Sequence, residues 1–211
     1  MDGPSGSGKS SASRGVARAL GFRYLDTGAM YRAITWWMLE QGVDLADPAA
    51  IAGRAGEPVL AIGTDPDAPG VSVGGTDVAA AIRTREVTSA VSAVSAVPEV
   101  RARLVAEQRA LIGDGDIVVE GRDIGTVVAP GAPVKVYLTA SPEARARRRN
   151  AELAGTTVEA QRAEMARRDT LDSTRKADPL VMAADAVELD TTELNLDEVI
   201  SEVLRLVKER T

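Results

Sequence analysis

The stretch Gly3-Pro-Ser-Gly-Ser-Gly-Lys-Ser10 matches the phosphate-binding loop pattern G-x-x-x-x-G-K-[ST]. Its glycines let successive backbone N–H groups point at phosphate oxygens, and the helix expected next turns its positive end toward the same anion. We expect Lys9 to reach the β- and γ-phosphates of a nucleoside triphosphate and Ser10 to ligate Mg²⁺. The residues expected to contact ATP are Gly3, Pro4, Ser5, Gly6, Ser7, Gly8, Lys9, Ser10 and Ser11.

The composition excludes several classes of chemistry. The 211 residues include no cysteine and no histidine, so disulfides, thiolate nucleophiles and imidazole bases are all unavailable. The net charge of −6 argues against a general nucleic-acid binder. No apolar run of about 18 residues and no signal segment occurs, so we expect no membrane association and a cytoplasmic location. A single-domain monomer is the simplest expectation for this length.

Strands and helices alternate along the chain. A helix is predicted from Lys9 to Leu20, ending at Gly21, and a strand follows near 22–25. Further strands are expected at 117–120, 134–138 and 186–189, and further helices at 98–112, from Ser141 onward, from a capping box at Thr156 toward Asp172, and at 196–208. Because the strands are short unalternating apolar runs, they indicate a parallel sheet covered on both faces. The fold class predicted is α/β, a P-loop NTPase fold with a parallel sheet flanked by helices.

Two features modify this fold. Proline and glycine punctuate short β-like runs between Glu57 and Val78, which predicts a small β-containing insertion. A buried strand ordinarily precedes the phosphate loop in such folds, yet only Met1 and Asp2 do so here. We therefore expect four or more apolar residues upstream in the native product.

The second substrate distinguishes the classes of phosphate-loop protein from one another. The chain lacks the N-K-x-D segment that GTPases use to read guanine, and it is too short for the large ATPases. Small kinases carry arginines on a closing flap, and arginine suits phosphate because its planar fork is bidentate. One C-terminal stretch is rich in this residue, with Arg145, Arg147, Arg148, Arg149, Arg162, Arg167, Arg168 and Arg175.

Further motifs span nearly the whole chain. They are Asp26-Thr-Gly-Ala-Met-Tyr-Arg32, Ile82-Arg-Thr84, Val119-Glu-Gly-Arg-Asp-Ile-Gly-Thr-Val-Val128, Ala132-Pro-Val-Lys-Val136 and Arg168-Asp-x-x-Asp172-x-x-Arg175. With these motifs the chain resembles the bacterial cytidylate kinases, which move the γ-phosphate of ATP to CMP or dCMP. The insertion fits too, because this family enlarges its monophosphate-binding flap there. The resemblance implies a core of residues 1–26, 101–140 and 177–211, a flap of 27–100, and lid and ribose-contacting helices in 141–176.

The resemblance also implies roles for individual residues. Arg32 and Arg122 would clamp the CMP phosphate, with Thr27 and Tyr31 nearby. The cytosine edge would be read by Ser92, Arg101 and Asp123; the ribose and phosphates would meet Arg168, Asp172 and Arg175; and Arg83 would support the flap. The Asp123 carboxylate can accept from the exocyclic amino group of cytosine, whereas uracil presents a carbonyl oxygen there.

The implied mechanism needs no histidine. The CMP phosphate is already mostly deprotonated at neutral pH because its second pKa lies near 6, so catalysis reduces to alignment and charge neutralisation. We expect Arg145 and Arg149, one helical turn apart, to enter over the γ-phosphate beside Lys9, with Arg148 as an alternative.

Two other functions remain open from the sequence. A kinase acting on a sugar or a shikimate-like hydroxyl would use Asp26 as base, and a catalytically silent module would bind nucleotides without releasing ADP. The preference between CMP and dCMP and the tolerance of UMP are also open.

Overall fold

A layer of parallel strands forms the centre of the computed structural model, which describes residues 1–152 and 157–210. Strand β1 (Arg23–Asp26) pairs in parallel with β5 (Ile117–Glu120), and β6 (Val136–Thr139) pairs in parallel with β7 (Val187–Asp190). The predicted parallel sheet is confirmed. The β6 and β7 strands start later than the apolar runs suggest, at Val136 and Val187.

The first two residues join the two strand pairs. The Met1 ammonium donates to the Val119 carbonyl at 2.6 Å, and the Asp2 amide donates to the Val136 carbonyl at 2.9 Å. Asp2 also forms an isolated parallel bridge with Tyr137. Residues 1–2 therefore occupy the strand position between β5 and β6, immediately before the phosphate loop.

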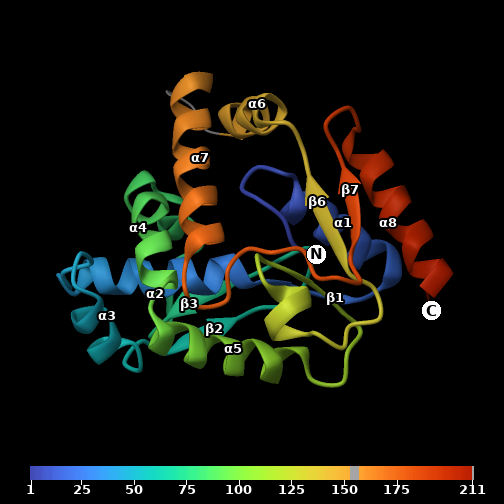
Figure 1. Cartoon of the computed structure of the whole chain (residues 1–211). Coiled ribbons are helices and arrows are strands. Elements are labelled where there is room, and N and C mark those ends of the chain that lie inside the picture. Colours follow the sequence, from blue (N-terminus) through green and yellow to red (C-terminus); the bar gives the residue numbers. More distant parts are fainter. Residues whose placement is uncertain (153–156, 211) are drawn as a thin grey trace.

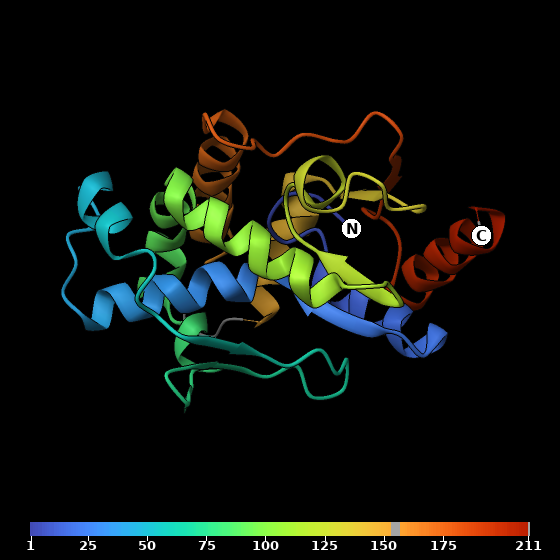
Figure 2. The same cartoon turned by 90° about the horizontal axis from the view of Figure 1, so that it is seen from below.

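Helices cover both faces of this layer (Figures 1 and 2). Helix α1 (Lys9–Leu20) starts at the phosphate loop and ends at Gly21, whose φ of 68° is the left-handed value expected of a glycine stop. Helix α8 (Leu196–Arg210) packs against α1. On the other side lie α2 (Thr27–Glu40) and α5 (Pro98–Ile112), the latter with the predicted bounds.

The predicted β-containing insertion is present between α2 and α5. Its three strands form a small antiparallel sheet in the order β2-β3-β4, and short helices flank it. The elements are α3 (Pro48–Arg54), β2 (Leu60–Ile62), β3 (Val71–Val73), β4 (Thr76–Asp77), η1 (Ala81–Arg83) and α4 (Arg85–Ser95). The sequence analysis did not predict α4, because its many Val, Ser and Thr residues are weak helix formers. Its apolar side, with Val87, Val91 and Val94 buried, is what stabilises it.

Two helices stand over the phosphate loop, at the top of Figure 1. Helix α6 (Pro142–Glu152) packs against α7 (Val158–Thr174), and α7 also packs against α4. The expected capping box at Thr156 lies outside the described residues. Helix α7 is capped by Thr157, whose hydroxyl accepts from the Ala160 amide at 3.2 Å.

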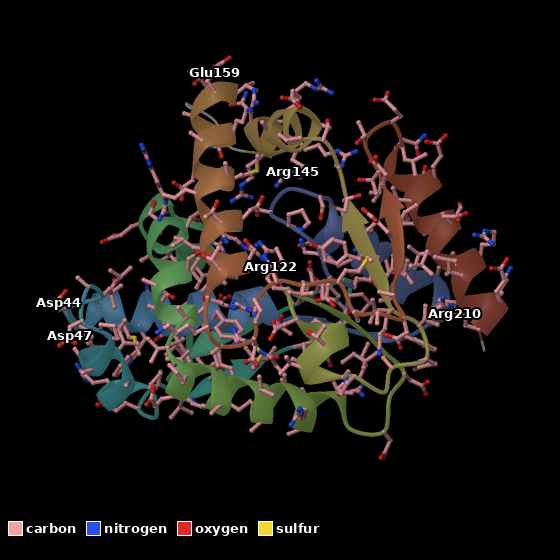
Figure 3. All side chains as sticks on the ribbon, viewed as in Figure 1. Asp44, Asp47, Arg122, Arg145, Glu159 and Arg210 are labelled. Atoms are coloured by element: carbon pink, nitrogen blue, oxygen red, sulfur yellow. The ribbon has the colours of Figure 1, made fainter. Side chains whose placement is uncertain are left out.

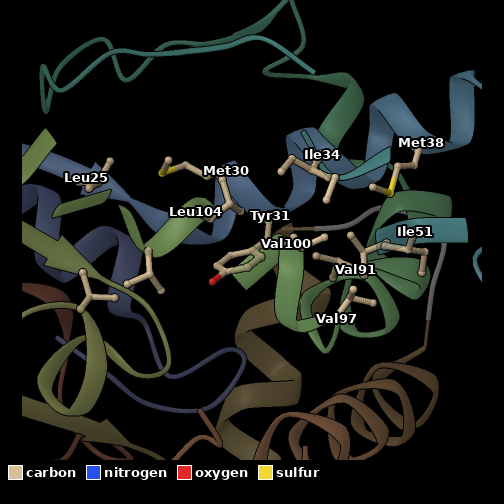
Figure 4. Close-up of a cluster of buried hydrophobic side chains, with 14 of the residues drawn as sticks. Leu25, Met30, Tyr31, Ile34, Met38, Ile51, Val91, Val97, Val100 and Leu104 are labelled. Atoms are coloured by element: carbon tan, nitrogen blue, oxygen red, sulfur yellow. The ribbon is translucent and has the colours of Figure 1, made fainter. Parts of the chain in front are cut away.

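The largest apolar cluster fixes the helix that carries several site residues. Met30, Ile34 and Met38 recur every four residues on α2 and are fully buried, as are Val100 and Leu104 of α5. Figure 4 shows them side by side. Burying such side chains contributes about 1.5–3 kcal/mol each. The cluster therefore anchors α2 so that its first turn faces the cleft. No described helix has both the length and the apolar character needed to cross a membrane.

Candidate active site

The phosphate loop adopts a conformation that only glycine allows at its start. Gly3 has a φ of +144°, and a Cβ there would lie 2.1 Å from the Leu138 carbonyl oxygen. The Lys9 ammonium donates to the Pro4 carbonyl at 2.7 Å and to the Ser7 hydroxyl at 3.3 Å. Lys9 is thus buried inside the curl of the loop and lines the cleft in front of it.

An acidic residue that the sequence analysis missed lies beside Ser10. The Ser10 hydroxyl donates to Glu120 Oε2 at 3.0 Å, and the Tyr24 hydroxyl donates to Glu120 Oε1. Burial, and then the nearby Asp26 carboxylate, raise the pKa of Glu120. Glu120 ends strand β5 at the carboxyl edge of a parallel sheet, and that position is the signal that could have identified it.

The edge of the cleft across from the loop carries a linked pair of charged residues. Arg122 donates to Asp172 Oδ2 at 2.9 Å and to the Gly3 carbonyl at 2.9 Å. Asp172 also accepts from the Ser92 hydroxyl at 3.3 Å. Burial pushes the pKa of Asp172 up, but Arg122 and its hydrogen bond leave this pKa below its usual range. Arg122 therefore bridges the phosphate loop and helix α7.

Asp123 is a buried carboxylate of the site, 4% exposed. It accepts from Arg101, and Arg175 lies 3.4 Å from its other oxygen. Arg101 is also bound by Asp178 at 2.7 Å. Burial raises the pKa of Asp123, and the two arginines oppose that shift. The Tyr31 hydroxyl nearby is buried and has no hydrogen-bond partner among the described residues, so this part of the cleft offers polar groups to a ligand.

The N-terminal part of α2 forms part of the wall of the cleft. Thr27 donates to the Glu120 carbonyl at 2.7 Å. Arg32 donates to the Ile82 carbonyl at 3.1 Å and to the Thr88 hydroxyl at 2.8 Å, both neutral acceptors. Asp26 caps α2 through the Ala29 amide at 2.9 Å and pairs with Arg83 at 2.9 Å. Both carboxylate oxygens of Asp26 therefore have hydrogen-bond partners.

The arginines of α6 differ from the expected arrangement. Figure 3 labels one of them, Arg145. Arg145 pairs with Asp169 at 2.5 Å and donates to the Ser5 carbonyl at 2.9 Å, so it lies against the outside of the loop. Arg148 donates to the Thr191 hydroxyl at 2.9 Å and is turned toward the 191–194 segment. Of the three, Arg149 lines the cleft.

The cleft gathers most of the residues singled out from the sequence. Besides the loop it is lined by Thr27, Tyr31, Arg32, Arg83, Ser92, Arg122, Asp123, Arg149, Arg168, Asp172 and Arg175, together with Asp26 and Glu120. Arg101 lies behind Asp123, and Arg145, Gly3, Pro4 and Ser7 are not part of the lining. Among the described lining residues, seven side chains are cationic and four are carboxylates.

The cations of this cleft are crowded. Burial, then repulsion from Arg122, lowers the pKa of Lys9 to about 7. Burial, then repulsion from Arg168, lowers the pKa of Arg32 to about 9. Burial and Arg122 lower the pKa of Arg168 to about 10. Since each group loses affinity for its proton, the site favours an added anion that would neutralise them.

Comparison with known proteins shows which family the chain belongs to. The family model for cytidylate kinase matches residues 1–209. The chain belongs to the cytidylate kinase family. It is 59% identical to the cytidylate kinase of Streptomyces avermitilis, over 100% of this chain and 92% of that protein. It is 59% identical to the cytidylate kinase of Nocardia farcinica and 55% to that of Mycobacterium leprae, covering 93% and 95% of those proteins.

Membership of the cytidylate kinase family confirms the resemblance and the P-loop fold inferred from the sequence. The described residues include no cluster of three or more acidic, histidine or cysteine side chains able to hold a metal ion. Ser10 and Glu120 nevertheless offer adjoining oxygen atoms at the phosphate loop. This donor set fits Mg²⁺, which is commonly bound by one or two side chains together with substrate phosphates.

Proposed function

We propose that the chain transfers the γ-phosphoryl group of ATP to CMP and dCMP, forming ADP and the nucleoside diphosphate. The observation that carries this proposal is the excess of cationic side chains that line the described cleft, seven against four carboxylates, in a chain of net charge −6. Such a local excess matches two phosphorylated substrates held side by side. The curated relatives, each named cytidylate kinase, support cytosine as the base of the acceptor.

The donor half of the site would be the phosphate loop with Lys9 and Ser10. The backbone amides of the loop and the start of α1 suit the β- and γ-phosphates of ATP. Ser10 and Glu120 would hold Mg²⁺, which neutralises phosphate charge when bound. Lys9 is already fixed by Pro4 and Ser7, so its ammonium needs little reorganisation to meet the γ-phosphate.

The acceptor half would lie between α2, α4 and the end of β5. Arg32 and Arg122 would bind the CMP phosphate together with Arg168, which lines the same cleft and donates to the neutral Ser5 hydroxyl at 3.5 Å. Asp123 would accept from the cytosine amino group, with Ser92 and Arg101 beside it. Asp172 and Arg175 would meet the ribose. The buried Tyr31 hydroxyl, to which no described residue forms a hydrogen bond, is a further donor for this substrate.

The chemistry follows from this arrangement of anions. An oxygen of the CMP phosphate forms the new bond to the γ-phosphorus as the bond from that phosphorus to the β,γ-bridging oxygen breaks, and ADP carries away the electron pair. No base acts because the attacking oxygen is already ionised. The chain contributes orientation through Arg32 and Arg122 and charge neutralisation through Lys9.

Two segments are proposed to close over the substrates, residues 27–100 as a flap and 141–176 as a lid. Arg149 is placed to approach the transferring group because it already lines the cleft. Arg145 would do so only after exchanging Asp169 for phosphate. Closure would exclude water and so prevent wasteful hydrolysis of ATP. Because one chain provides the complete set of groups, we propose that it acts as a monomer.

The direct test is ADP release from ATP and Mg²⁺ with CMP, dCMP, UMP, AMP, shikimate and a sugar panel. We expect turnover with CMP and dCMP and much slower turnover with the others. A kinase for hydroxyl acceptors would need Asp26 as base, yet Asp26 is occupied by Ala29 and Arg83. Turnover with an alcohol, or binding of ATP and CMP without ADP release, would contradict the proposal.

Binding of ATP should be accompanied by proton uptake near pH 8. The pKa of Lys9 in the free protein is about 7, so its amine is mostly neutral at pH 8. A bound triphosphate would raise this pKa and make Lys9 charged. The binding enthalpies measured by calorimetry in Tris and in HEPES should then differ by nearly the difference between the ionisation enthalpies of the two buffers, because about one proton is taken up per site. The difference should vanish for Lys9→Met, and identical enthalpies in the wild type would contradict the assignment.

A further inference from the structure

A carboxylate outside the proposed substrate contacts links the two halves of the site. Asp2 is 6% exposed, and its two oxygens accept from two consecutive backbone amides, Oδ1 from Ile124 and Oδ2 from Gly125, each at 2.8 Å. These amides directly follow Arg122 and Asp123, and they open the π-helical turn η2 (Ile124–Val128). Asp2 therefore fixes the backbone immediately after the two residues assigned to the CMP phosphate and base.

The backbone of Asp2 is also held by hydrogen bonds. Its amide donates to the Val136 carbonyl at 2.9 Å, and its carbonyl accepts from the Leu138 amide at 2.8 Å. The next residue is Gly3, the first of the phosphate loop, whose carbonyl accepts from Arg122. A short path of hydrogen bonds thus runs from the sheet through Asp2 to the acceptor side of the cleft.

The absence of a side chain at Gly125 permits its close approach to Asp2. A Cβ at Gly125 would lie 3.3 Å from Asp2 Oδ2 and 3.2 Å from the Lys135 side chain. The glycine therefore allows its amide to reach the carboxylate closely. A carboxylate that accepts two backbone amides is held by charge-assisted hydrogen bonds, which are stronger than bonds between neutral groups.

We infer that Asp2 is a positioning residue that sets the distance between the phosphate loop and the Arg122-Asp123 segment, and so aligns CMP with ATP. This inference rests on the proposed function. In-line transfer is sensitive to small displacements, since an error of about 1 Å can reduce the rate about a hundredfold. Asp2 touches neither substrate, and it acts through the two residues that bind the acceptor.

The test compares Asp2→Ala and Asp2→Asn with the wild type in the coupled ADP-release assay. Alanine removes both acceptors, whereas asparagine keeps the shape but retains one acceptor oxygen and turns an NH₂ group toward the second amide. We expect kcat/KM for CMP to fall at least about tenfold in Asp2→Ala and by less in Asp2→Asn. The ratio of CMP to UMP turnover should fall as well, while KM for ATP stays within about twofold.

Val203→Ala is the matched control for loss of stability. Val203 is 2% exposed in the cluster between α1, α8 and β6 and does not line the active-site cleft, so its truncation leaves a cavity outside that cleft. It should lower the melting temperature and leave the CMP:UMP ratio unchanged. The inference is overturned if the Asp2 variants only lower the melting temperature as Val203→Ala does, or if both fail to fold. Failure of the proposed function is a separate result, because the wild type would then not phosphorylate CMP.

Discussion

Lys9→Ala is expected to lower kcat about a thousandfold while the protein still binds CMP. Lys9 is buried within the phosphate loop, and it is the cation that the loop itself directs at the transferring phosphoryl group. Charge that develops there in the transition state would lose its nearest fixed counter-charge. The CMP site is built from Arg32, Arg122 and Asp123, which the substitution leaves in place.

The measurement pairs steady-state ADP release with calorimetric titration of CMP. The dissociation constant for CMP should remain within about threefold of the wild-type value. Lys208→Ala provides the matched control, since Lys208 is an exposed lysine in the last turn of α8 and its loss changes the net charge equally. A Lys9 variant that retains a tenth or more of wild-type turnover would contradict the role assigned to this residue.

Asp123→Asn should reduce the preference for CMP over UMP about a hundredfold. The Asp123 carboxylate is buried and can only accept hydrogen bonds from a ligand, which suits the cytosine amino group. Uracil places an oxygen opposite it and leaves two acceptors facing one another. The amide of asparagine can donate to that oxygen, so UMP turnover should rise as CMP turnover falls.

Ratios of kcat/KM for CMP and UMP measure this effect, and KM for ATP reports on the donor site. Asp178→Ala is the matched control because Asp178 also accepts from Arg101, whose Nε lies 2.7 Å from Asp178 Oδ2. The Asp178 side chain is a third exposed and does not line the cleft. The control should keep the preference for CMP. Unchanged discrimination in Asp123→Asn would contradict the reading of cytosine by this residue.

The sequence predicted those parts of the fold that local rules determine. The phosphate loop, helix α1 with its Gly21 stop, helix α5 and the apolar strand β5 follow from loop chemistry, capping and burial patterns. Helix α4 did not, because packing of its valines overrides their weak helix propensity. Met1 and Asp2 lie in the strand position between β5 and β6, and two residues are too few to form a recognisable pattern.

The sequence indicated which residues belong to the candidate site, but not which of them bind one another. The loop pattern and the family motifs indicate which arginines matter, and the structure gathers most of them in one cleft. Which residue each arginine binds depends on tertiary contacts between residues far apart in sequence. Arg145 with Asp169, Arg148 with Thr191 and Arg122 with Asp172 are such pairs. The roles of Glu120 and Asp2 were not predicted from the sequence, because they depend on contacts with residues of other elements.

The account depends on two adjacent anion sites, one for a triphosphate and one for a cytidine monophosphate. A crystal structure of the protein with CMP and a non-hydrolysable ATP analogue tests it most directly. We predict the γ-phosphate at Lys9, the CMP phosphate between Arg32 and Arg122, and the cytosine amino group at Asp123. An empty second site, or a pyrimidine bound away from Asp123 while the analogue occupies the loop, would contradict the account.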